Sequence, residues 1–129
     1  VEELRYFDGS VSKTNRPVPR QIISSKTSTI LTGMLTSVVK NGQGKNAAVP
    51  GYYVAGKTGT AQIAEGGEYS NKTNHSFIGF APVQKPKFVM ILKFNNPKKG
   101  SYSSVTTAPL FSRRAKFILD YYHVVPDAL

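Results

Sequence analysis

The sequence predicts an α+β fold in which an antiparallel sheet is covered by helices. Three observations carry this prediction: a helical stripe of apolar residues in the first half, three consecutive strand-like segments in the middle, and a second helical pattern near the end. Consecutive strands with helices before and after them form antiparallel sheets with the helices outside. The chain has 129 residues, enough for one domain with its own core.

The first 23 residues are expected to form an extended or irregular lead-in. They carry Gly9, Pro17 and Pro19 among polar residues, which disfavours regular structure apart from a short strand at 20–23. A lead-in of this composition resembles the continuation of a preceding segment.

A helix is expected at 24–42. Its apolar residues recur with helical spacing and predict one buried stripe, in which methionine and leucine are core residues: Ile30, Leu31, Met34, Leu35, Val38 and Val39. Ser24 or Ser25 can cap the start by accepting a hydrogen bond from free backbone N–H groups. The pair Asn41-Gly42 predicts a left-handed end.

The segment 52–94 is expected to hold three strands. "YYVAGKTGTAQIA" combines β-branched and aromatic residues with glycines and predicts a strand across 53–63. "EGGEYSNKTN" follows as a flexible turn. "HSFIGFAP" and "KPKFVMILKFNNP" then predict an antiparallel hairpin that is partly buried on both faces.

A last helix is expected at 106–124. Thr106 or Thr107 can cap it, and Pro109 fits its first turn because proline needs no N–H partner there. Its apolar face would consist of Leu110, Phe111, Ala115, Ile118, Leu119 and Tyr122.

The composition favours anionic partners without selecting one. Seventeen Lys and Arg against seven Asp and Glu give a formal charge of +10. The basic residues are scattered and do not alternate with aromatics, so we expect a solvated basic surface and no nucleic-acid partner. No apolar run reaches the ~20 residues of a membrane span, and the start lacks signal-peptide character, so any anchor or export signal is expected outside this chain.

Metal and thiol chemistry are not expected. The chain has no cysteine, and its two histidines, His75 and His123, are far apart and lack metal-ligand spacing. Both histidines are therefore expected at the surface or at strand ends. The patterns at Asn71 and Asn74 match glycosylation acceptors, and we interpret them only as marks of an exposed loop.

The stretch "GYYVAGKTGTAQ" matches two motifs that place a lysine beside an anion. From Gly51 to Thr58 it satisfies the phosphate-loop pattern, while Lys57-Thr58-Gly59 is a K-T-G triplet. A phosphate loop needs a glycine-rich turn followed by a helix. Here "YYVA" favours a strand and no helix follows, so the nucleotide-binding interpretation is rejected.

The alternative is an edge strand that borders a cleft. Side chains alternate along a strand, so Thr58 and Thr60 would share one face and Lys57 the other. Free N–H groups at a sheet edge can bind an acyl oxygen. An ammonium, two hydroxyls and these N–H groups suit an acyl group next to a carboxylate.

The chain resembles the C-terminal part of the transpeptidase domain of class B penicillin-binding proteins. The resemblance covers about residues 16–126 and rests on "AGKTGTAQ" with its preceding helix, on "HSFIGFAP", on "KFVMILKFNNP" and on the final "APLFSRRAKFILDYY", in the family's order and spacing. It implies a serine D,D-transpeptidase that cross-links peptidoglycan stem peptides ending in D-Ala-D-Ala and that is acylated by β-lactams such as penicillin. It implies no cofactor and no metal.

The resemblance also implies a role for each residue of the triplet strand. Lys57 would support proton transfer and bind the substrate carboxylate, and Thr58 and Thr60 would offer hydroxyls to that carboxylate. The backbone N–H of Thr60 would form half of an oxyanion hole, and Gly59 would keep the strand surface open. The location would be the extracytoplasmic face of a bacterial cell envelope, with other wall-synthesis proteins as further partners.

The family's nucleophile motif S-x-x-K and its S-x-N motif lie upstream of K-T-G. "SVSK" at Ser10–Lys13 and "SVVK" at Ser37–Lys40 match the first pattern, but neither stands in the family's position, and S-x-N does not occur. We therefore expect residues 1–129 to be a C-terminal fragment of the domain that works with the remainder and contains no nucleophile. The alternatives are a penicillin-binding-like sensor without transpeptidation and a basic module that binds an anionic polymer.

Overall fold

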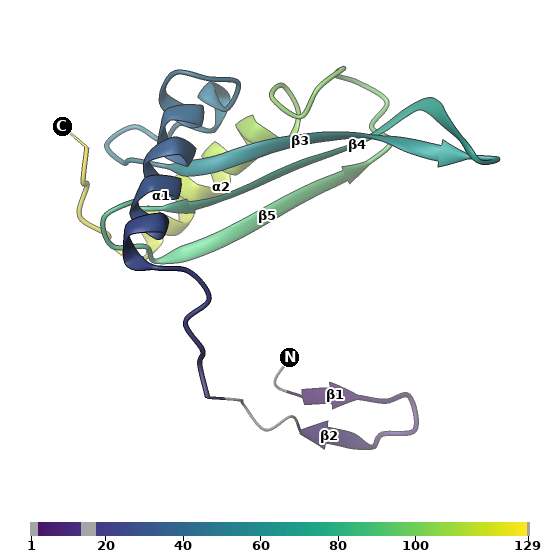
Figure 1. The fold of residues 1–129 in the computed structure, drawn as a ribbon, viewed down its shortest axis with the longest axis horizontal. Helices are drawn as coiled ribbons and strands as arrows, with labels where there is room; N and C mark the ends of the chain where they lie inside the picture. Colours follow the sequence, from purple (N-terminus) through teal and green to yellow (C-terminus); the bar gives the residue numbers. More distant parts are fainter. Residues whose placement is uncertain (1–2, 14–17, 129) are drawn as a thin grey trace.

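The computed structural model describes residues 3–13 and 18–128. Its body is a three-stranded antiparallel sheet with two helices, and a small hairpin lies at the N-terminal end of the chain (Figure 1). The elements are β1 (Glu3–Arg5), β2 (Val11–Lys13), α1 (Ser25–Lys40), the 3₁₀ helix η1 (Lys45–Ala47), β3 (Ala55–Glu65), β4 (Glu68–Ala81), β5 (Phe88–Asn95) and α2 (Thr107–Tyr121). The strand order β3-β4-β5 confirms the predicted α+β class.

The expected lead-in at 1–23 contains a hairpin that was not foreseen. β1 and β2 pair antiparallel, and Gly9 has φ 84° in the turn between them. Ser10 donates from its N–H and its Oγ to Asp8 Oδ1, and these hydrogen bonds lower the pKa of Asp8. The strand expected at 20–23 is wrong, because that segment has no regular structure. Residues 1, 2 and 14–17 of the lead-in, Pro17 among them, lie outside the described residues.

Helix α1 starts as predicted but ends differently. The Ser24 side chain accepts a hydrogen bond from the Thr27 N–H, which confirms the cap. Asn41 has φ −121° and Gly42 does not have a positive φ, so the predicted left-handed end is wrong. The chain instead folds back over the last turn, and the N–H groups of Gly42 and Gly44 both donate to the Val38 carbonyl. Glycine allows this close approach, since a Cβ at Gly42 would lie 3.0 Å from that carbonyl oxygen.

The apolar stripe of α1 is buried only at its C-terminal end. Val39 is buried, whereas Ile30, Leu31 and Met34 are 49%, 45% and 60% exposed, so their predicted core positions are wrong for this structure. The physical reason is that, among the described elements, α1 makes substantial contact only with β3 and η1. Its first turns therefore present apolar side chains to solvent.

The β3–β4 hairpin is longer than the sequence predicted. Gly66 and Gly67 have φ 64° and 89°, the left-handed values that a two-residue type I′ turn requires. Strand pairing therefore continues up to Glu65↔Glu68, and the expected flexible turn at 65–74 is largely strand. Asn71 and Asn74 lie in β4, which corrects the prediction of an exposed loop there.

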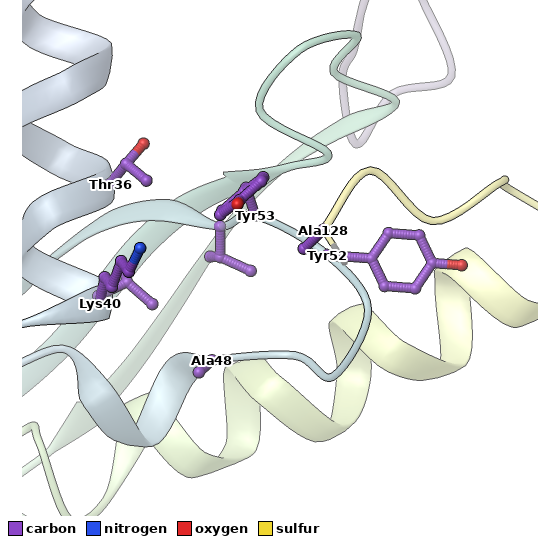
Figure 2. A pocket seen from close by; sticks show the side chains of 8 residues that line it. Thr36, Lys40, Ala48, Tyr52, Tyr53 and Ala128 are labelled. Carbon is purple, nitrogen blue, oxygen red and sulfur yellow. The ribbon is translucent and has the colours of Figure 1, made fainter.

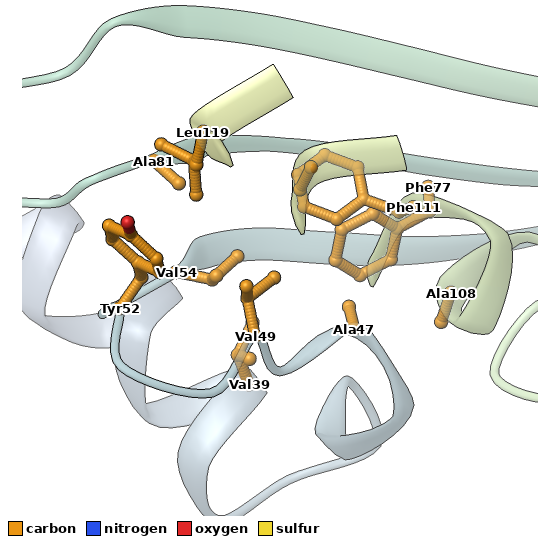
Figure 3. Close-up of a cluster of buried hydrophobic side chains, with 11 residues drawn as sticks. Val39, Ala47, Val49, Tyr52, Val54, Phe77, Ala81, Ala108, Phe111 and Leu119 are labelled. Carbon is orange, nitrogen blue, oxygen red and sulfur yellow. The ribbon is translucent and has the colours of Figure 1, made fainter. Parts of the chain in front are cut away.

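The core lies between the sheet, α2 and the segment that links α1 to β3 (Figure 3). At its centre the rings of Phe77 and Phe111 have centroids 4.7 Å apart, and Phe88 packs against Phe111 at 6.3 Å. On α2 the residues Phe111, Ala115 and Leu119 are fully buried, as predicted for its apolar face. Tyr122 was expected on that face but is 68% exposed, because the helix ends there and its ring packs edge-on against Tyr121.

Two glycines make room for this aromatic pair. Gly56 of β3 and Gly79 of β4 lie opposite one another. A Cβ on Gly56 would lie 2.6 Å from Phe77 Cζ and 2.8 Å from the Ile78 carbonyl oxygen. Small side chains are therefore required where β3 enters the sheet, one residue before Lys57.

We expect Gly56→Ala to destabilise the protein by about 1–3 kcal/mol, because the added methyl group overpacks the core against a backbone atom. Urea unfolding of the full-length protein, followed by circular dichroism, measures the loss. Gly33→Ala is the matched control, since a Cβ at Gly33 of α1 meets nothing within 4 Å. A stability unchanged by Gly56→Ala would contradict the packing described here.

Candidate active-site strand

The edge strand β3 brings Lys57 and Thr58 together. In the described sheet β3 pairs only with β4, so its other edge is free. The Lys57 side chain is exposed, and its Nζ donates to the Thr58 carbonyl at 2.8 Å and to Thr58 Oγ1 at 3.3 Å. An ammonium and a hydroxyl therefore meet at the free edge, although their side chains leave opposite faces of the strand.

The backbone groups of residues 58 and 60 also point to this edge. In an antiparallel strand the N–H and C=O of one residue point to the same side, and the sides alternate along the chain. The Gly59 carbonyl accepts from Ser76 Oγ of β4 at 3.4 Å, so it points inward. The N–H groups of Thr58 and Thr60 consequently point outward, where no strand of the described residues takes them.

Thr60 is exposed, but its hydroxyl is already engaged. Thr60 Oγ1 accepts from the Ser103 N–H at 3.1 Å and lies 3.0 Å from Ser103 Oγ. Ser103, 2% exposed, belongs to the loop before α2 and was missed by the sequence analysis. No local pattern signals a contact between residues 43 positions apart. The structure thus shows Lys57 hydrogen-bonded to Thr58, and Thr60 hydrogen-bonded to Ser103.

Gly59 has a local packing reason to be glycine. A Cβ on this residue would lie 2.6 Å from Ser76 Oγ, the side chain of its cross-strand partner. The absence of a side chain therefore leaves room for Ser76, and it also leaves the sheet surface beside Lys57 clear.

His75 is the largest departure from the sequence analysis at this site. It was expected at the surface or at a strand end, yet it is fully buried in the middle of β4, opposite Thr60. Its Nδ1 lies 2.9 Å from Thr106 Oγ1 and its Nε2 lies 2.9 Å from Thr73 Oγ1. Burial is tolerated because both ring nitrogens have hydroxyl partners.

The prediction that the Thr106 or Thr107 side chain caps α2 is wrong. Thr106 occupies the N-cap position, but its hydroxyl is used by His75 and by the Tyr102 carbonyl. The Thr107 hydroxyl donates to the Ser103 carbonyl at 3.1 Å. Both side chains hold the preceding loop instead of the helix end.

The serines of the two S-x-x-K patterns lie in other surroundings. Ser10 donates to Asp8 in the β1–β2 turn, and Ser37 lies on the exposed side of α1, where it accepts from Asn41 Nδ2 at 3.2 Å. Within the described residues, neither side chain forms a hydrogen bond with a residue of β3. Their placement is that of a turn serine and a helix-surface serine.

A small apolar cavity of about 180 Å³ lies away from this strand edge, between α1 and the segment that leads into β3 (Figure 2). Thr36 and Lys40 of α1, Tyr53 and Ala128 are among its lining residues. None of the predicted site residues lines it.

Among residues 3–13 and 18–128, no group of three or more His, Asp or Glu side chains could hold a metal ion. In the same residues no helix has the length and apolar character to cross a membrane.

Comparisons with known proteins support the family resemblance and the fold. The family model described as the penicillin binding protein transpeptidase domain matches residues 1–116. Stage V sporulation protein D of Bacillus subtilis is 46% identical over 91 residues, which are 69% of this chain and 14% of that protein. Peptidoglycan D,D-transpeptidase FtsI of Escherichia coli is 33% identical over 124 residues, which are 93% of this chain and 21% of that protein.

A solved structure agrees as well. Penicillin-binding protein 3 of Mycobacterium tuberculosis, complexed with ampicillin, superposes with a TM-score of 0.79 at 30% identity, over 98% of this chain and 30% of that one. The chain thus spans about a fifth or less of the two curated relatives described above. With nine-tenths of its length matched by one family model, this chain belongs to the penicillin-binding protein transpeptidase domain family.

Proposed function

We propose that this chain supplies the K-T-G wall of a D,D-transpeptidase active site, which cross-links peptidoglycan through an acyl-serine intermediate. The observation that carries the proposal is the convergence of Lys57 Nζ, Thr58 Oγ1 and outward backbone N–H groups on the free edge of β3. A positive charge, hydroxyl donors and backbone donors in one row fit a substrate with a carboxylate next to the reacting acyl group.

In this proposal each group has one task. Lys57 attracts the terminal carboxylate of a D-Ala-D-Ala stem peptide and supports proton transfer, and Thr58 and Thr60 donate hydroxyl hydrogen bonds to that carboxylate. The Thr60 N–H donates to the oxyanion that forms when a serine attacks the penultimate carbonyl. Loss of one such donor typically costs ~3 kcal/mol of transition-state stabilisation. The C–N bond then breaks, D-alanine leaves, and an amine of a neighbouring strand takes the acyl group.

The nucleophilic serine and its lysine belong, in this proposal, to residues outside this chain. The sheet face that carries Lys57 also carries the apolar side chains of Ile78, Val89 and Ile91, which are 48%, 71% and 65% exposed. Their exposure supports the proposal that a further segment of the protein covers this face. β5 has a free edge in the described sheet. We assign this surface to the remainder of the same transpeptidase domain, and we place the working protein at the extracytoplasmic face of the bacterial envelope.

Two reactions of the full-length protein test this function. We expect fluorescent penicillin to form a stable adduct, and a donor pentapeptide ending in D-Ala-D-Ala to lose D-alanine to an amine acceptor. Adduct formation without acyl transfer would instead support a penicillin-binding sensor. Absence of both, with salt-sensitive binding of anionic polymer, would support a basic binding module.

A further inference from the structure

We infer that Ser103 and His75 are positioning residues for Thr60: Ser103 orients the Thr60 hydroxyl toward a ligand carboxylate, and His75 anchors the loop that carries Ser103. The inference rests on the proposed function, because it assigns Thr60 to carboxylate binding. It adds two buried side chains to the proposed site. Both lie outside the K-T-G triplet, and no sequence motif indicates them.

The first step is the fit between Ser103 and Thr60. The Ser103 N–H donates to Thr60 Oγ1 at 3.1 Å, and the two hydroxyl oxygens are 3.0 Å apart. A hydroxyl can accept two hydrogen bonds and donate one. If Ser103 donates from both its N–H and its Oγ, both lone pairs of Thr60 Oγ1 are occupied. The Thr60 proton is then left to donate to a carboxylate at the exposed edge.

The second step is the rigidity of Ser103. Its carbonyl accepts from the N–H groups of Thr106 and Ala108 at 3.3 and 3.0 Å, and from the Thr107 hydroxyl at 3.1 Å. Three donors from the start of α2 thus hold one residue, which is also 2% exposed. Ser103 therefore has a fixed position from which to orient the flexible hydroxyl of Thr60.

The third step is the anchor beneath the loop. His75 faces Thr60 across the β3–β4 pair and is fully buried, and its Nδ1 lies 2.9 Å from Thr106 Oγ1. Thr106 Oγ1 donates its own proton to the Tyr102 carbonyl at 3.2 Å, so it accepts from His75 Nδ1–H. In the neutral ring, which carries one proton, His75 Nε2 then accepts from the Thr73 hydroxyl at 2.9 Å. The chain of donors runs in one direction, from Thr73 through His75 and Thr106 to the loop backbone.

This arrangement predicts a ligand-selective effect, which a merely structural residue would not produce. The experiment uses the full-length protein and compares acylation rates for benzylpenicillin, which carries the carboxylate, with those for its methyl ester, which lacks the charge. We expect Ser103→Ala to slow acylation by benzylpenicillin about tenfold, the effect of losing a hydrogen bond to a charged group, and to leave the ester rate within about twofold.

Three further variants test the anchor. Thr106→Val removes the hydroxyl with little change of shape, and His75→Leu removes both ring nitrogens, so each is expected to lower the ratio of the penicillin rate to the ester rate. His75→Asn keeps a side-chain N–H at the position of Nδ1 and is expected to restore most of that ratio. Should His75→Leu fail to fold, Thr106→Val breaks the same hydrogen bond and carries the test.

The outcomes separate this inference from the proposed function. Wild-type protein that reacts with benzylpenicillin, together with variants whose two rates fall equally or not at all, would overturn the inference alone. Wild-type protein that reacts with neither ligand would overturn the proposed function and, with it, the inference.

Discussion

Replacing Lys57 with alanine is expected to lower the rate of penicillin acylation of the full-length protein by a factor of about 10² or more. The Lys57 Nζ is the cationic group at the free edge of β3, 2.8 Å from the Thr58 carbonyl and 3.3 Å from the Thr58 hydroxyl. A positioned group that assists proton transfer typically contributes 10²- to 10⁴-fold. Stopped-flow or gel-based measurement with a fluorescent penicillin gives the second-order rate constant of acylation.

The matched control for this variant is Lys93→Ala. Lys93 is an exposed residue of β5, where it lies opposite Ser76 of β4. Its replacement by alanine changes the net charge by the same amount as Lys57→Ala but leaves β3 unchanged. Unfolding curves of both variants should coincide with that of the wild type, because Lys57 and Lys93 are both exposed. If Lys57→Ala protein acylates at the wild-type rate, Lys57 does not have the proposed role.

Replacing Phe111 with alanine is expected to cost about 3–5 kcal/mol of folding free energy, the usual range for removing a buried phenylalanine. Its ring is fully buried against Phe77, with ring centroids 4.7 Å apart (Figure 3). The Phe88 ring lies on it as well, with centroids 6.3 Å apart. The loss combines the hydrophobic transfer of the ring with the cavity that remains. Because Phe77 lies directly opposite Thr58, a relaxed core would also shift the triplet strand.

Urea unfolding of the full-length protein measures this loss, and two other substitutions calibrate it. Phe117→Ala removes the same side chain from the same helix at a position that is 64% exposed, so a change of less than about 1 kcal/mol is expected. Phe111→Leu keeps most of the volume and should fall between the two. Equal losses for Phe111→Ala and Phe117→Ala would show that the core is not where this structure places it.

Local patterns predicted most of the elements correctly, and their failures have identifiable causes. The Ser24 cap, the strand through Lys57 and the apolar face of α2 depend on spacing within one segment. The β3–β4 hairpin was predicted too short, because two adjacent glycines were interpreted as flexibility when their positive φ angles instead form a tight turn. The prediction for the end of α1 was wrong because the Val38 carbonyl accepts hydrogen bonds from the following loop. The pair Asn41-Gly42 alone does not reveal this contact.

The candidate site divides in the same way. The resemblance of "AGKTGTAQ" to a known family pointed to Lys57, Thr58, Gly59 and Thr60, and strand periodicity predicted which of them share a face. Neither source identified Ser103 or the buried His75, and His75 was expected at the surface or at a strand end. The local sequence Thr73-Asn74-His75-Ser76 does not reveal that the distant Thr106 hydroxyl satisfies one of the ring nitrogens.

The sequence by itself determined the class of fold, the family and the strand that carries the lysine, because each of these depends on the order and spacing of nearby residues. Only the tertiary structure decided that the Lys57 ammonium lies 3.3 Å from the Thr58 hydroxyl, and that Thr60 is held by a loop 43 residues further along. The physical reason is that hydrogen bonds between segments distant in the chain depend on packing, and packing around Phe77 and Phe111 brings the loop, His75 and the triplet strand to one place.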